Sequence, residues 1–177
     1  MVIYADRQEI TGWGGFWVGV FQGKLVFLER ASGNSYLSLP GEKQESSLGL
    51  EQFAERCGLS VALNSTGETQ LVWGQLRQYL GGTRKQFDLP IQLFGTEFQV
   101  RVWQKLLDIP WGVVRTYGEI GLSLGNSGLA RAIGQANSRN PISIVVPCHR
   151  VVAMNGLGGY TGGLDLKKRL LRLEGVL

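Results

Sequence analysis

The feature that most constrains the fold is an apolar, glycine-rich stretch over residues 13–29. Its two arms carry aromatic and β-branched side chains and meet at the pair Gln22-Gly23. A two-residue loop that contains glycine suits the positive φ angles of hairpin turns, so we expect an antiparallel hairpin here. A third strand from residues 2–6 or from residues 34–39 would extend the hairpin into a small sheet.

Two helices are expected after this sheet. Residues 40–47 are polar and predict a loop. Residues 48–57 have the apolar spacing of a helix, which the following glycine ends. Ser65 and Glu68 have the spacing of a capping box, which predicts the start of a second helix that runs to Leu80.

Helical spacing also dominates the second half of the chain. Apolar residues repeat at helical intervals between Thr96 and Pro110, so we expect a helix that the proline ends. A last helix is expected over residues 164–173, with its leucines facing inward and the basic residues 167–169 facing outward.

These patterns predict an α/β fold of the α+β type in two domains. Residues 1–90 would form a small antiparallel-sheet domain with helices, and residues 91–177 a mainly helical domain that contains a helix-turn-helix. Residues 83–92, a basic and polar stretch, are the expected linker.

The helix-turn-helix pattern lies between residues 116 and 136. Thr116 can cap a helix over residues 117–124, residues 125–126 break it, and Ser127 can cap a second helix through Ala136. Such a pair of short helices is either a nucleic-acid-binding motif or a plain packing unit. The residue content of the second helix bears on this choice.

That second helix carries small residues around a single arginine. Ala130, Ala132 and Gly134 surround Arg131, where a reader of the major groove would carry side chains that contact base edges. Small residues favour close approach of the backbone, as in minor-groove binding, with Arg131 free to insert into the base stack.

The only histidine of the chain, His149, follows Cys148, which is one of only two cysteines. A reactive thiol is the first hypothesis, and a small buried cysteine is the alternative. The β-branched run 142–146 predicts a short strand, whose extended geometry would place the two side chains on opposite faces. Proton transfer between them would then need a bridging water or a turn. Cys57 lies in a dissimilar setting, so we expect no disulfide and a reducing compartment.

Composition and charge bound the class of protein. With 44% hydrophobic and 18% charged residues, the sequence is typical of a folded, water-soluble protein, and neither a membrane span nor a signal peptide is expected. The net charge is +4, and the excess lies in residues 91–177, with 10 basic against 5 acidic residues, whereas residues 1–90 have 8 against 9. A one-sided positive field favours a polyanion such as nucleic acid, and the alternative is a solvated basic face without a ligand.

A series of motifs follows in order through the second half, and the most specific is Pro147-Cys148-His149-Arg150-Val151. The others are Phe98-Gln99-Val100-Arg101-Val102-Trp103, Pro110-Trp111-Gly112, Thr116-Tyr117-Gly118-Glu119-Ile120, Gly125-Asn126, Arg131-Ala132-Ile133-Gly134, Asn140-Pro141 and Tyr160-Thr161-Gly162-Gly163-Leu164. With these motifs, residues 94–175 resemble the O6-alkylguanine-DNA alkyltransferases, which are also called methylated-DNA–protein-cysteine methyltransferases. The first half matches that family only in general character.

The resemblance implies DNA repair by direct reversal of damage. The reaction would be a stoichiometric, irreversible transfer of a methyl or larger alkyl group from guanine O6 in double-stranded DNA to Cys148, after nucleotide flipping and minor-groove binding. O4-alkylthymine is a second candidate substrate. The fold implied is RNase H-like in the first half and winged-helix-like in the second.

No cofactor and no metal are implied. Some members of the family hold zinc in the first half through Cys and His ligands, but this chain has only Cys57 and no histidine there. The family also implies a monomer, with cooperative binding along DNA left open. It would act in the cytoplasm with the nucleoid, or in the nucleus of a eukaryote.

By resemblance, His149 would deprotonate Cys148 through a water, and Glu174 would orient the imidazole. Asn140 would brace the turn before the cysteine, and Tyr117 would donate a hydrogen bond to guanine N3. The Val151 carbonyl would read the exocyclic amine of guanine and the Thr161 amide would face O6. The implied pocket residues are Tyr117, Asn137, Ser143, Val151, Tyr160 and Thr161. The implied DNA-binding residues are Arg131, Tyr117, Gly118, Asn126, Ala130, Ala132 and Gly134.

Two departures from the family pattern bear on function. Ser127-Gly128 stand where many relatives have Pro-Lys, which removes a positive charge beside DNA and predicts weaker or more salt-sensitive binding. Ser143 stands where some relatives have a pocket proline, and the loop 153–159 is short and rich in glycine. The size of alkyl group that the pocket accepts is therefore left open.

Two other classes of protein compete with this reading. A cysteine hydrolase needs a histidine beside the cysteine in space, and in such enzymes it is usually distant in sequence. A pure binding module is the second rival, either a transcriptional helix-turn-helix protein or an alkyltransferase-like protein that binds damage without repair. The lack of base-reading side chains disfavours the first of these modules, and the presence of Cys148 disfavours the second.

Overall fold

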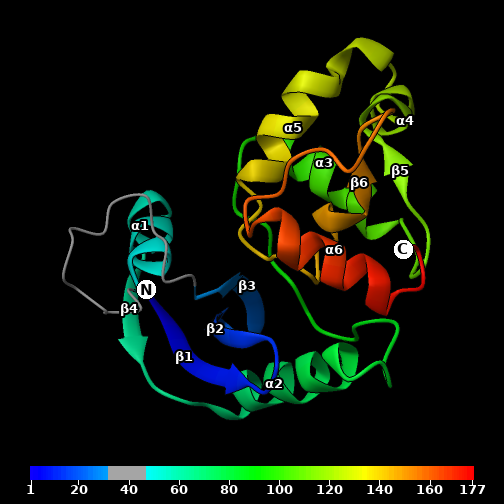
Figure 1. Ribbon diagram of the computed structural model, residues 1–177. Helices are drawn as coiled ribbons and strands as arrows, with labels where there is room; N and C mark the ends of the chain where they lie inside the picture. Colours follow the sequence, from blue (N-terminus) through cyan, green and yellow to red (C-terminus); the bar gives the residue numbers. More distant parts are fainter. Residues whose placement is uncertain (32–46) are drawn as a thin grey trace, which may run out of the picture.

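The computed structural model describes residues 1–31 and 47–177, and its first half is built on a small sheet (Figure 1). The strands β1 (Val2–Ile10), β2 (Gly14–Phe21) and β3 (Lys24–Arg30) pair antiparallel. Gln22 and Gly23 have φ angles of 51° and 75°, so the predicted hairpin turn is confirmed.

The third strand of the prediction is β1, at the first of the two predicted positions. The other candidate, residues 34–39, lies outside the described residues, as does nearly all of the predicted loop 40–47. A fourth strand, β4 (Ser60–Leu63), pairs parallel with β1, so the sheet has the order β3-β2-β1-β4. The sequence does not predict β4, because four half-buried or exposed residues are too few to show an alternating pattern.

Two helices complete the first half, as predicted. α1 (Leu48–Arg56) packs on β4, and α2 (Gly67–Leu80) packs along β1 and β2 (Figure 1). α1 is followed by Gly58, whose φ of 66° turns the chain away from the helix.

The predicted capping box of Ser65 with Glu68 is wrong. Thr66 is the cap of α2, because its hydroxyl accepts a hydrogen bond from the Thr69 amide at 3.2 Å. The Thr69 hydroxyl in turn accepts from the Thr66 amide at 2.8 Å. A threonine hydroxyl thus takes the place of the glutamate that the sequence pattern leads one to expect.

The second half consists of helices around two very short strands. α3 (Glu97–Leu107) begins at the Thr96 cap as predicted, but it ends three residues before Pro110. The remaining elements are β5 (Arg115–Thr116), α4 (Tyr117–Ser123), the 3-10 turn η1 (Ser127–Leu129), α5 (Ala130–Ser138), the 3-10 turn η2 (Cys148–Arg150), β6 (Val151–Val152) and α6 (Leu164–Leu173).

The predicted helix-turn-helix pair is α4 and α5, with one correction. Thr116 caps α4 as predicted. Ser127, however, does not cap the second helix: the Asn126 side chain accepts from the Gly128 amide at 2.8 Å and caps η1 instead. α5 then begins at Ala130, after Leu129, without a side-chain cap.

The predicted strand over residues 142–146 is wrong. Within residues 1–31 and 47–177, only single bridges form there, between Leu28 and Ile142 and between Ser143 and Val146. The segment is bent by Ile144, whose φ is 72°. One bridge to Leu28 docks the bent segment on the edge of β3, and the Leu28 amide donates to the Pro141 carbonyl at 2.8 Å. Cys148 and His149 follow in η2, so they are not on opposite faces of a strand.

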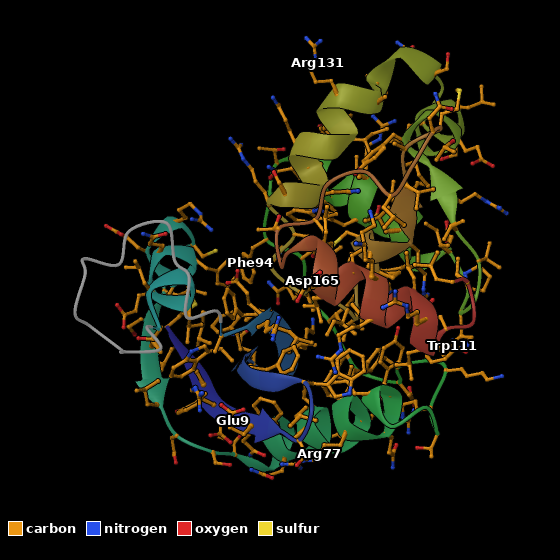
Figure 2. All side chains as sticks on the ribbon, in the orientation of Figure 1. Glu9, Arg77, Phe94, Trp111, Arg131 and Asp165 are labelled. Atoms are coloured by element: carbon orange, nitrogen blue, oxygen red, sulfur yellow. The ribbon has the colours of Figure 1, made fainter. Side chains whose placement is uncertain are left out.

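The main hydrophobic core joins both halves of the chain. It combines residues of the sheet and α2 with residues of α3, α5 and α6, among them Phe16, Trp73, Leu76, Val102, Trp103, Ile133 and Leu170. A second cluster between α1 and the sheet includes Phe27 and Phe53, and Phe94 packs against it. Figure 2 shows Phe94 between the part with α1 and the part with α6. No helix of the described residues is long and apolar enough to cross a membrane.

Candidate active site

Cys148 lies at the start of η2 with only 6% of its surface exposed. Asn140 Nδ2 lies 3.2 Å from the Cys148 Sγ and donates to it. Burial raises the pKa of the Cys148 thiol, and the hydrogen bond from Asn140 and the charge of Lys167 oppose this effect without reversing it. The resting cysteine is therefore a thiol, and it needs a base before it can act as a nucleophile.

Asn140 also closes the bent segment that leads to the cysteine. Its Nδ2 donates to the Val146 carbonyl at 2.8 Å, and its Oδ1 accepts from the Ile142 amide at 3.0 Å. The two ends of the segment are thus tied by one side chain, as expected for a brace. This tie holds Cys148 in place even though the segment is not a strand.

His149 is fully buried, and its Nε2 lies 2.7 Å from Glu174 Oε1. Burial lowers the pKa of His149, and the neighbouring Glu174 opposes this effect. A neutral imidazole donates through Nε2 to the carboxylate and keeps Nδ1 as an acceptor. The Nδ1 atom has no hydrogen-bond partner among the residues that the structure describes, so it is free to hold a water.

Glu174 follows α6 directly and is the centre of a buried polar network. Its carboxylate accepts hydrogen bonds from Arg150 Nε (3.0 Å), from the Gly112 amide (3.3 Å), and from the Tyr79 hydroxyl. Burial would raise the pKa of Glu174, but the hydrogen bonds from His149, Arg150 and Tyr79 lower it to about 2. Glu174 is therefore ionised at neutral pH and fixes the orientation of His149.

Tyr79 and Arg150 are members of this network that sequence reasoning missed. Arg150 also donates through Nη1 to the Ile109 carbonyl at 2.6 Å, so the guanidinium ties η2 to the turn after α3. Tyr79 comes from α2 in the first half, and its hydroxyl lies 3.4 Å from His149 Nε2. Arg150 belongs to the motif around Cys148, so the sequence contains a signal that could have identified it. Tyr79 lies in the amphipathic helix α2, and nothing in the sequence distinguishes it from the core residues of that helix.

The prediction that Lys167 faces outward is wrong. The side chain is fully buried, and its Nζ donates to the carbonyls of Val151 (2.6 Å), Leu157 (2.5 Å) and Gly159 (3.2 Å). Burial lowers the pKa of Lys167 to about 8, and the proximity of Cys148 opposes the shift. Three carbonyls can satisfy a buried ammonium, which explains why a lysine stands on the inner face of α6.

Tyr117 begins α4 and lies half-buried beside the loop after β6. A Cβ atom at Gly158 would lie 3.0 Å from the Tyr117 ring, so the glycine makes room for the ring. Burial raises the pKa of the Tyr117 phenol, and the charge that Cys148 carries as a thiolate raises it further. Tyr117 therefore stays protonated and can donate a hydrogen bond.

A cavity of about 1010 Å³ opens beside Cys148. It lies between the two halves, because its wall includes Phe27 and Phe53 of the first half as well as residues of the second half. The structure brings together on this wall most of the residues predicted for the pocket and the thiol: Asn137, Asn140, Ser143, Cys148, Tyr160 and Thr161. Val151 and Tyr117 are not on the wall of this cavity.

Most residues predicted to contact DNA lie on α4, η1 and α5, remote from the sheet. Figure 2 shows Arg131 at the outer end of α5, pointing away from the rest of the molecule. Arg131, Asn126 and Ala130 are exposed, whereas Ala132, Gly134 and Gly118 are half-buried. Gly134 faces the Tyr117 ring, because a Cβ atom there would lie 3.9 Å from it.

Known proteins are similar to this chain in sequence. Residues 97–176 match the model of the family described as 6-O-methylguanine DNA methyltransferase, DNA binding domain. The methylated-DNA–protein-cysteine methyltransferase of Methanosarcina acetivorans is 55% identical over 102 residues, which cover 57% of this chain and 65% of that protein. The chain thus aligns with less than two thirds of the length of this curated relative.

Solved structures extend the similarity to the whole chain. The crystal structure of Mycobacterium tuberculosis O6-methylguanine methyltransferase matches 97% of this chain and 92% of its own, with a TM-score of 0.75 and 34% identity. This chain belongs to the O6-methylguanine DNA methyltransferase family. A structure of the Mycobacterium tuberculosis protein in complex with DNA matches equally well, with a TM-score of 0.75 and 34% identity.

Membership of the O6-methylguanine DNA methyltransferase family confirms the resemblance and the α/β fold class predicted from the sequence. The match to the family model includes Cys148, His149 and Glu174. Tyr79 lies outside the residues that this model matches. The hydrogen-bond network around Glu174 therefore joins residues inside the family-model match with Tyr79 from the first half of the chain.

Proposed function

We propose that this protein repairs DNA by transferring the alkyl group of O6-alkylguanine to Cys148, once per molecule. The observation that carries the proposal is the arrangement of three groups: a buried thiol, a neutral histidine whose Nδ1 has no partner among the described residues, and an ionised Glu174 that orients the histidine. This is the logic of a catalytic triad in which a water links the base to the nucleophile. Family membership supports the same reaction.

The chemistry balances without a cofactor. The Cys148 proton passes through a water to His149 Nδ1, and the thiolate attacks the alkyl carbon as its bond to guanine O6 breaks. The electron pair of that bond stays on the guanine, which is stabilised by a hydrogen bond from Tyr117 and finally takes up a proton. The product is a thioether on Cys148, which has no leaving group that water can displace, so the protein is consumed.

Pocket residues hold the guanine in this proposal. The Val151 carbonyl accepts from the exocyclic amine, and the Thr161 amide faces O6. Lys167 supports this recognition, because it binds the Val151 carbonyl and the loop carbonyls of Leu157 and Gly159. The lysine thereby fixes the segment that reads the base.

DNA binding places the base in this pocket. α5 enters the minor groove with its small residues, and Arg131 fills the space that the flipped nucleotide leaves. Flipping costs a few kcal/mol, which the contacts of α5 offset. The proposed partner is double-stranded DNA that carries O6-alkylguanine, with O4-alkylthymine as a second candidate. The protein acts as a monomer, in the cytoplasm and on the nucleoid of a prokaryote or in the nucleus of a eukaryote.

The proposal is tested with a duplex oligonucleotide that carries one O6-methylguanine. We expect the intact mass to increase by one methylene, the adduct to map to Cys148, and one equivalent of DNA to be repaired per protein without turnover. The C148A variant should bind the duplex and transfer nothing, whereas the control C57A should transfer normally. An unchanged mass together with DNA binding would reject the transfer reaction and favour a damage-binding module.

A further inference from the structure

The segment after β6 makes a tight turn that carries the most exposed large apolar side chain of the described residues. Ala153 and Gly156 form an antiparallel bridge, and the Gly156 amide donates to the Ala153 carbonyl at 3.4 Å. Met154 and Asn155 therefore occupy the tip of a small hairpin, and Met154 is 87% exposed. A single exposed apolar residue is ordinary on a protein surface, so the surroundings of Met154 decide whether it has a function.

One buried side chain holds both legs of this hairpin. The Lys167 ammonium donates to the Val151 carbonyl before the tip at 2.6 Å. It also donates to the Leu157 and Gly159 carbonyls after the tip, at 2.5 Å and 3.2 Å. Lys167 is fully buried in α6, so it ties the hairpin to the body of the second half. The base of the hairpin is therefore fixed, and this base defines the position of the tip.

The base of the hairpin also lies against the Tyr117 ring. A Cβ atom at Gly158 would lie 3.2 Å from the Tyr117 hydroxyl and 3.3 Å from the Ala153 amide nitrogen, so the phenol and the start of the hairpin lie side by side. Figure 1 shows this segment beside α4, which Tyr117 begins. At the opposite edge of the ring, a Cβ atom at Gly134 of α5 would lie 3.9 Å from Tyr117 Cε1. The Tyr117 ring is thus placed between the hairpin and α5.

Two exposed side chains of different chemistry therefore flank Tyr117. Arg131 lies three residues before Gly134 in α5, and Figure 2 shows it pointing away from the rest of the molecule. Met154 lies at the tip of the hairpin on the other side of the ring. In the proposed reaction Tyr117 donates to the flipped guanine, so the DNA passes over the surface around this ring. While Arg131 fills the gap in the base stack, Met154 faces the DNA beside that gap.

We propose that Met154 enters the minor groove as an apolar wedge and packs on the base pair next to the flipped nucleotide. This inference rests on the transfer reaction proposed above, and it adds a second residue that assists flipping. Apolar side chains, methionine among them, insert at base steps in minor-groove complexes and partly unstack them. Methionine suits this contact because it is unbranched, flexible and polarisable. The face of the neighbouring base pair is uncovered only after flipping, so the contact shifts the equilibrium toward the flipped state.

The test compares transfer from duplex and from single-stranded DNA, because only the duplex requires the base to leave a paired stack. One oligonucleotide with a single O6-methylguanine is mixed with excess protein, with and without its complementary strand. The single-turnover rate of methyl transfer to Cys148 is measured for each, and the ratio of the duplex rate to the single-strand rate reports on flipping. A variant with a smaller folded fraction lowers both rates and leaves their ratio unchanged.

The deciding variant is M154S, which replaces the long apolar side chain by a short polar one. We expect its rate ratio to fall about tenfold, because burying a methionine side chain is worth at least this factor in an equilibrium. M154L keeps an apolar side chain of similar length and should retain the ratio. The matched control is L71S on α2 in the first half, where Leu71 is 52% exposed, and its ratio should be unchanged.

The inference is overturned if M154S has the same ratio as the unmodified protein. It is equally overturned if M154L lowers the ratio as much as M154S, because the effect would then not come from an apolar contact, or if L71S does so, because the position would not matter. In each of these cases, methyl transfer by the unmodified protein still upholds the proposed function. If the unmodified protein transfers no methyl group from either DNA, the proposed function itself fails, and the inference fails with it.

Discussion

Cys148 separates two polar regions of opposite character. On one side, the Glu174 carboxylate accepts hydrogen bonds from His149, Arg150, Tyr79 and the Gly112 amide, so its bonding capacity is filled. On the other side, Asn137 and Tyr160 of the cavity wall carry buried polar atoms that have no partner among the described residues. The comparison teaches that the Glu174 carboxylate is fully paired in the free protein, whereas the polar side chains of the cavity wall are paired only in part.

His149 has one paired and one unpaired ring nitrogen among the described residues. Its Nε2 belongs to the filled network and its Nδ1 belongs to the unpaired group. Substitutions on the Glu174 side should therefore change stability and activity together. Substitutions of Asn137 or Tyr160 on the cavity wall should cost less stability, because their unpaired polar atoms form no hydrogen bond within the described residues.

The largest effect is expected from E174Q. The amide keeps the shape of the side chain but removes the charge that pairs with Arg150, and losing one partner of a buried ion pair costs about 3–5 kcal/mol. The free energy of unfolding from urea titration should fall by about this amount, and transfer should slow because His149 loses its fixed orientation. The control is E55Q on the exposed side of α1, which should change neither quantity. Equal stability of E174Q and the unmodified protein would mean that the network is not preformed.

Acid should break the same network without any mutation. The pKa of Glu174 is about 2 in the folded protein and near 4.5 in the unfolded chain, so the unfolded chain binds more protons between these values. The contribution of Glu174 is complete above pH 4.5 and is lost as the pH falls toward 2, by about 3 kcal/mol in all. His149 acts in the same direction below its unfolded pKa, because burial lowers its pKa in the folded protein. The unfolding free energy measured from pH 7 to pH 3 should therefore fall, and it should fall less steeply for E174Q.

The two regions also differ in how far the sequence predicts them. The motif around Cys148 identifies the thiol, the histidine and Asn140, because the chemistry requires these residue types at fixed spacing. The sequence predicts the network around Glu174 only in part. Glu174 is near the end of the chain, and Tyr79 belongs to the first predicted domain. Folding brings both residues into one hydrogen-bond network with His149. Contacts between distant segments leave no local pattern in the sequence.

Local errors have a different origin. The run 142–146 has the composition of a strand, but it lies beside β3 only at single bridges and bends at Ile144. Lys167 was assigned to the surface by its charge, yet three backbone carbonyls accept its ammonium hydrogens in the interior. In both cases tertiary contacts override a propensity that holds on average.

The smallest of these effects, Y79F, tests whether the first half of the chain takes part in the chemistry. The variant removes one donor to Glu174 and leaves Arg150 and His149 in place, so the unfolding free energy should fall by about 1 kcal/mol. A carboxylate with one donor fewer attracts the His149 proton more strongly, which raises the histidine pKa. Because transfer requires neutral His149, the acid limb of the rate profile should move to higher pH. The control Y4F removes a half-exposed hydroxyl from β1 and should leave the profile unchanged. A profile of Y79F that coincides with that of the unmodified protein would limit Tyr79 to packing between the halves.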